Sequence, residues 1–181
     1  MRSFLKFAAI AALALVGAGS ANAQTATQDI TITATVTKAC TVNNAVAGTA
    51  GTAVIPVSLA GAVTTTPITP VGSPFANVVC NAPSNIQLTS LSGGVRNGVG
   101  VAPSGFTNII DYSATATWGG AIATVDTVTD PAAAGNESGA LAPIAAANAG
   151  ALSVLITPQT NALPLVIGSY ADTLRVSIIP Q

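Results

Sequence analysis

The sequence contains no histidine, and only 6% of its 181 residues are charged and 4% are aromatic. Without histidine the chain lacks the commonest general base and metal ligand, and two cysteines alone cannot complete a four-ligand zinc site. Five basic residues against six acidic ones leave no basic surface for phosphates, so nucleic acid is not an expected partner. High apolar content with low net charge also argues against disorder. These absences favour a chain that acts through its backbone and its apolar faces.

The first 23 residues have the three parts of a secretory signal peptide. Arg2 and Lys6 precede the apolar stretch Phe7 to Val16, and the small-x-small triplet Ala21 to Ala23 follows. This stretch is about half of the roughly 20 apolar residues that span a bilayer, so we expect cleavage after Ala23 and no transmembrane anchor. The remaining chain carries three basic and six acidic residues, a net charge of −3. We expect it to be exported and to form one domain.

Export gives the two cysteines a structural interpretation. Cys40 and Cys80 are the only pair, and in an oxidising compartment an isolated pair favours a disulfide. A reactive thiol would need an activating neighbour, for which Lys38 is the only candidate.

Period-two alternation dominates the chain, whereas the 3.6-residue period of helices is absent. The strongest case is Asp29 to Lys38, where Ile30, Ile32, Ala34 and Val36 alternate with threonines, as in a strand with one apolar face. The other predicted strands are Thr52 to Leu59, Phe75 to Cys80, Asn85 to Leu91, Asp111 to Trp118, Ala121 to Thr127, Leu152 to Thr157 and Asp172 to Ile179. Short strands separated by turn residues predict an all-β, immunoglobulin-like antiparallel β-sandwich.

Two glycine-containing segments support this prediction. Gly119 and Gly120 separate two alternating runs, and such a pair suits a two-residue hairpin turn that needs positive φ. The alanine-rich stretch Asp130 to Gly150 is interrupted every few residues by glycine or proline, so we expect a surface loop.

The sequence offers no constellation of catalytic residues. Six carboxylates remain after export, and most lie beside turn residues or at strand ends: Asp29, Asp111, Asp126, Asp130, Glu137 and Asp172. A serine nucleophile would have only Lys38 as a base, and no phosphate-binding or calcium-binding motif is present. We therefore expect no enzymatic activity, no metal and no cofactor.

The alternating segment before Cys40 has two possible roles. It pairs into its own sandwich as a first strand, or it completes the sheet of a neighbouring molecule by β-strand addition.

Three features together resemble subunits of chaperone-usher pili. They are the alternating ITITATV leading into Lys38-Ala39-Cys40-Thr41-Val42, the second cysteine at the end of VVC (Val78 to Cys80), and the carboxy-terminal run from Gly168 to Ile179. The likeness is strongest to the archaic and alternate branches, which include the spore-coat-U type of domain. Tyr112 to Gly120 is also similar to a mid-domain segment of alternate-branch pilins.

The resemblance implies a sandwich that lacks its last strand, with an N-terminal donor extension over residues 24–39 and a pilin domain over residues 40–181. Ile30, Ile32, Ala34 and Val36 would be donor side chains, and Leu174, Val176 and Ile178 would flank the acceptor groove. The implied partners are identical or related subunits, a periplasmic chaperone and an outer-membrane usher. The implied function is a structural subunit of a surface fimbria that supports adhesion and biofilm formation.

A second interpretation is a self-contained secreted β-sandwich that binds a carbohydrate or protein ligand through loops such as Gly93 to Gly105. The two interpretations differ in what residues 24–38 do. Removing them should leave a pilin unable to polymerise, whereas it should unfold a self-contained sandwich.

Overall fold

The computed structural model describes residues 31–43, 51, 53–58, 60–72, 75–98, 100–129 and 136–181. The chain divides into two units, Met1–Thr35 and Val36–Gln181. Of the first unit only residues 31–35 are described, and they form neither helix nor strand. The expected signal peptide lies outside the described residues.

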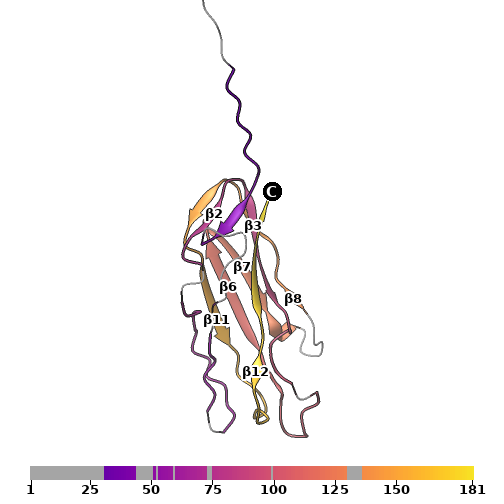
Figure 1. Cartoon of the computed structure of the whole chain (residues 1–181). Coiled ribbons are helices and arrows are strands. Elements are labelled where there is room, and N and C mark those ends of the chain that lie inside the picture. Colours follow the sequence, from indigo (N-terminus) through magenta and orange to yellow (C-terminus); the bar gives the residue numbers. More distant parts are fainter. Residues whose placement is uncertain are drawn as a thin grey trace, which may run out of the picture. The chain divides into compact units, whose positions relative to one another are not determined.

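The second unit is built from short strands (Figure 1). They are β1 (Cys40–Val42), β2 (Val78–Cys80), β3 (Ser84–Ser90), β4 (Val95–Asn97), β5 (Ile109–Ile110), β6 (Tyr112–Trp118), β7 (Ala121–Asp126), β8 (Glu137–Ser138), β9 (Ala142–Ile144), β10 (Asn148–Gly150), β11 (Ser153–Pro158), β12 (Tyr170–Ala171) and β13 (Leu174–Pro180). One 3₁₀ turn, η1 (Thr127–Thr129), is the only helical element among the described residues. The all-β prediction is confirmed.

The described strands form antiparallel sheets. Their orders are β1-β2-β10, β11-β6-β7, β12-β4-β5 and β13-β3-β8, with β9 also paired to β3. Figure 1 shows β6, β7 and β11 side by side along the unit. Strand β3 packs against β6 and β7, so the sheets face one another as a β-sandwich.

The core follows from the alternation of the long strands. In β3 the side chains of Ile86 and Leu88 are fully buried. They share one cluster with buried residues of β6, β7 and β11, which are Tyr112, Ala114, Ala116, Trp118, Ala123, Val125, Val154 and Ile156. Several of these are alanines, which let the facing layers approach closely.

The β6–β7 hairpin has the predicted glycine turn. Trp118 pairs with Ala121, so Gly119 and Gly120 are the whole loop. Both glycines have positive φ, 56° and 80°, as expected when the turn must match the twist of the strands.

Three sequence predictions need correction. Residues 31–38 alternate like a strand but form none, because within the described residues no partner supplies the ladder hydrogen bonds. Of the predicted strand over residues 52–59, the described residues 53–58 make one bridge, between Val57 and Val63, because the chain reverses just after them at Gly61, whose φ is 74°. The expected loop over residues 130–150 contains β8, β9 and β10, which pair with β3 and β2.

Candidate functional site

Strand β13 has one free edge in the described part of the chain. It pairs with β3 from Leu174 opposite Ser90 to Pro180 opposite Ser84. No other described strand pairs with it. An edge strand of this kind presents N–H and C=O groups to which a further strand can bond.

The apolar face of β13 is incompletely covered. Leu174, Val176 and Ile178 pack against the core but stay partly exposed, whereas Ile86 and Leu88 of the neighbouring β3 are 0% exposed. A strand whose inward side chains are half covered leaves apolar surface for another element to bury.

A groove of about 1080 Å³ lies against this face. Leu174, Val176 and Ile178, the three residues predicted to flank an acceptor groove, all line it. Apolar side chains from several other parts of the unit also line it, among them Val42, Ile55, Ile68, Phe75, Ile110, Val154 and Ile156. The volume is close to the upper end of the roughly 300–1,000 Å³ range of small-molecule pockets. An apolar groove along a free strand edge suits an extended peptide.

A partly buried polar network lies at the end of the groove where β13 begins. The Asp172 carboxylate accepts hydrogen bonds from the Tyr112 hydroxyl (2.6 Å) and the Ser90 hydroxyl (2.6 Å). It also accepts bonds from the backbone N–H of Ser92 (2.9 Å) and of Thr173 (2.7 Å). Burial, then the hydrogen bond to Asp172, raises the pKa of Tyr112 above its ordinary value of 10. The phenol therefore stays a protonated donor that joins β6 to the start of β13.

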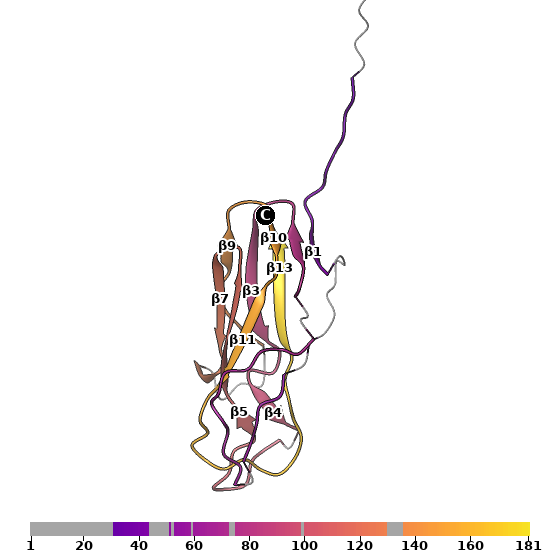
Figure 2. The ribbon, with the colours of Figure 1, turned by 90° about the vertical axis from the view of Figure 1, so that its left-hand side faces the viewer.

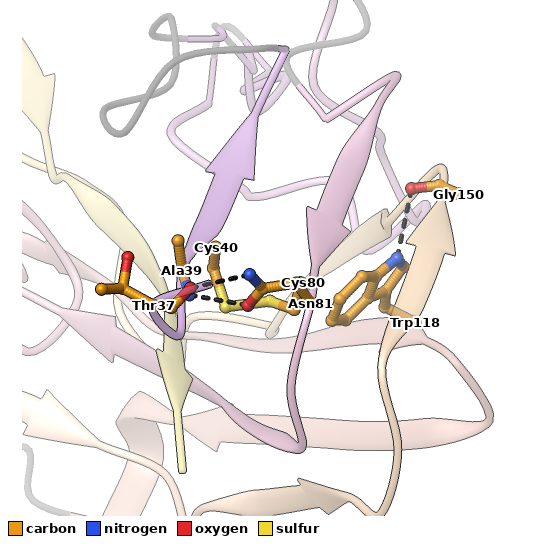
Figure 3. The surroundings of a disulfide bond; sticks show 7 residues. All are labelled: Thr37, Ala39, Cys40, Cys80, Asn81, Trp118 and Gly150. Atoms are coloured by element: carbon orange, nitrogen blue, oxygen red, sulfur yellow. Dashed lines mark hydrogen bonds between the residues drawn. A yellow bond between two sulfur atoms is a disulfide. The ribbon is translucent and has the colours of Figure 1, made fainter. Parts of the chain in front are cut away.

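The predicted disulfide is confirmed at the opposite end (Figure 3). Cys40 and Cys80 pair directly across β1 and β2, and their Cα atoms are 4.1 Å apart. Cys80 is buried in the core, and Cys40 also lines the groove. The bond therefore attaches the first strand of the unit to its interior.

Asn81 holds the residues that precede this disulfide (Figure 3). The backbone N–H of Ala39 donates to the Asn81 side-chain oxygen (2.8 Å), and the Asn81 amide nitrogen donates to the Thr37 carbonyl (2.8 Å). The Asn81 backbone N–H donates to the Ala39 carbonyl (3.1 Å). Three hydrogen bonds thus attach Thr37 and Ala39 to the residue that follows β2.

The predicted donor residues are exposed where the structure describes them. Ile32 is 90% and Val36 80% exposed, and Ala34 is exposed as well. Ile30 lies outside the described residues. The apolar side chains that would form one face of a strand are therefore unburied, although residues 31–38 form no strand within this chain.

The carboxylates do not gather into a site. Asp29 and Asp130 lie outside the described residues, and within the described ranges no three His, Cys, Asp or Glu side chains are grouped to hold a metal ion. Burial raises the pKa of Asp111, partly offset by the nearby Arg96. A search of the same ranges for a helix of membrane-spanning length and hydropathy finds none.

Sequence reasoning missed Asn81 and the network around Asp172. An asparagine directly after a strand is an ordinary turn residue, so nothing in the sequence singles out Asn81. The partners of Asp172 lie 60 and 82 positions away, which places this network beyond local patterns.

A scan of protein-family models and searches of curated proteins and of solved structures find no match for this chain.

Proposed function

We propose that this protein is the structural subunit of a surface fimbria, and that its copies join by β-strand addition. The segment over residues 29–38 of one copy enters the groove beside β13 of the next. The observation that carries this proposal is the apolar groove along the free edge of β13.

The segment and the groove match in period and chemistry. Alternate residues of an extended strand lie about 6.6 Å apart on one face, and Ile30, Ile32, Ala34 and Val36 would take this spacing if the segment bound as a strand. Leu174 and Val176 repeat along β13 with the same period and line the groove. Donor side chains can therefore meet the groove in regular succession.

The energy of such a joint is large. Each buried large aliphatic side chain contributes roughly 1.5–3 kcal/mol, and each ladder hydrogen bond about 0.5–1.5 kcal/mol. Several of each would make subunits separate very slowly without a covalent bond.

The remaining features of the proposal follow from the resemblance to chaperone-usher pilins. The sandwich is immunoglobulin-like and lacks its last strand. The chain is exported through its signal peptide to the periplasm, where a chaperone covers the groove until the usher delivers the subunit to the fibre. The fimbria then supports adhesion and biofilm formation at the cell surface.

The test compares the chain from Gln24 onward with a variant that lacks residues 24–35, which retains the contacts of Thr37 and Ala39. We expect the longer chain to form multimers that resist mild denaturant and appear as fibres by electron microscopy. The shortened variant should stay monomeric and bind a synthetic peptide of residues 24–38 with one-to-one stoichiometry. Multimers that persist without the segment would show that strand addition is not how the copies join.

A further inference from the structure

If the proposed function holds, two grooves can receive the segment over residues 29–38: that of a second copy and that of the same chain. The length of the segment does not determine which of these two grooves it enters. Ten extended residues span about 33 Å, and the seven residues of β13 only about 23 Å, at roughly 3.3 Å per residue. The chain's own segment is long enough to fill its own groove.

The direction of the chain before Cys40 does distinguish the two grooves. Cys40 pairs with Cys80, and Ser84, shortly after Cys80, pairs with Pro180. The start of β1 and the end of β13 therefore lie at one end of the unit, as Figure 2 also shows. The groove extends from Cys40 toward Leu174, in the direction that β1 itself follows. A segment that precedes Cys40 must reverse its direction to enter it.

That reversal would have to occur at residues 37–39, where Asn81 opposes it. The side chain of Asn81 bonds to the Thr37 carbonyl and to the Ala39 N–H, and its backbone bonds to the Ala39 carbonyl. Val36, the next residue toward the N-terminus, is 80% exposed. A chain folded back at this point would lose the side-chain bonds.

The local sequence also opposes a tight turn. Chain reversals within a few residues use glycine, proline, asparagine or aspartate. Thr37, Lys38 and Ala39 include none of these, and Thr37 is β-branched, which disfavours positive φ.

We propose that Asn81 is a specificity-determining residue that directs the segment into the groove of a second copy of this chain. By holding Thr37 and Ala39 at the end of β2, it stabilises the outgoing chain direction and disfavours self-insertion. This inference rests on the proposed function.

The test uses the chain from Gln24 onward, refolded with its disulfide at low concentration. Asn81→Ala removes both side-chain hydrogen bonds, and Asn81→Asp keeps the acceptor for Ala39 but loses the donor to Thr37. Asn85→Ala, an asparagine of β3, is the matched control. Insertion of Gly-Asn-Gly between Lys38 and Ala39 supplies turn residues and serves as a positive control.

Limited proteolysis of residues 24–36 measures the ratio of self-inserted to open monomers, and light scattering gives their mass. One hydrogen bond shifts an equilibrium about 5-fold, so two shift it about 30-fold. We expect the ratio to rise about 30-fold in Asn81→Ala and at least about 5-fold in Asn81→Asp, whose carboxylate oxygen would face the Thr37 carbonyl, and to stay unchanged in Asn85→Ala. The fraction of wild-type chains in multimers should increase with protein concentration. Variant monomers that have inserted their own segment should not form multimers at any concentration.

Two results would overturn the inference alone. One is an unchanged ratio in Asn81→Ala when the Gly-Asn-Gly insertion raises it. The other is a wild-type monomer whose segment is already protected at every concentration. Failure of the function itself is distinguished by adding the peptide of residues 24–38 to an Ile32→Asp chain, whose own segment is disabled. If neither that peptide nor the inserted segment becomes protected, the groove does not take this strand and both proposals are wrong.

Discussion

Replacing Ile32 with aspartate tests the joint between subunits at one side chain. Ile32 is 90% exposed within a single chain, so the substitution should leave the unfolding of the monomer unchanged. In a fibre the same side chain would lie in a groove lined by Val176, Val154 and other apolar residues. The substitution should therefore lower the stability of the multimers and not that of the monomer.

The magnitude follows from what Ile32 would bury. Loss of its transfer into the groove costs roughly 1.5–3 kcal/mol. An aspartate there must also be desolvated or protonated, which costs at least about 2 kcal/mol more. A total near 4 kcal/mol weakens each joint by about 10³-fold.

The assay is the denaturant concentration at which multimers separate, read on gels and by light scattering. Thr33→Asp is the matched control, since it adds the same charge to the same segment on the opposite face of a strand. We expect Thr33→Asp multimers to resemble wild type within about 0.5 kcal/mol. The reasoning would be refuted if Ile32→Asp multimers resisted denaturant as well as wild type, or if both variants lowered the resistance of the multimers equally.

The remaining predictions concern the two ends of the groove. Replacing Cys40 and Cys80 together with serine should lower the free energy of unfolding by about 4 kcal/mol, the chain-entropy value for a loop of 40 residues. Urea titrations of the variant and of the oxidised protein measure this, and equal midpoints would contradict it. Tyr112→Phe should cost about 1–3 kcal/mol, because Asp172 loses a buried donor. Since the folded protein raises the pKa of Tyr112 above 10, its protonated form is favoured and stability should fall as the pH rises past 10. Melting temperatures between pH 8 and pH 11 should show this fall in wild type, and a fall of the same size in Tyr112→Phe would mean that another group causes it.

Alternation in the sequence predicts the long strands well. The ends of strands β3, β6, β7, β11 and β13 each lie within about two residues of the ends of a strand predicted from the sequence. This agreement arises because buried and exposed residues alternate along these strands. The glycine pair between β6 and β7 was also predictable from local turn chemistry, and the disulfide from the expectation that the chain is exported.

The short strands and the groove were not predictable in this way. Strands β8, β9 and β10 lie in a glycine- and alanine-rich stretch, and they become strands because β3 and β2 offer edges to pair with. Residues 31–38 show the opposite case, a strong strand pattern without a described partner. The sequence therefore shows which segments favour a strand conformation, whereas the tertiary structure determines whether a neighbouring strand is available to pair with them.

The disulfide beside Asn81 also decides how a fibre of such subunits would bear tension. A pull on the N-terminal segment would first load the hydrogen bonds of Thr37 and Ala39 to Asn81 and then Cys40, the first residue of a strand with only three residues. The Cys40–Cys80 bond passes the load directly to β2 in the core. In such a fibre the hydrogen bonds between β1 and β2 would be spared from shearing, and the non-covalent joint between neighbours, which can re-form after rupture, would yield first.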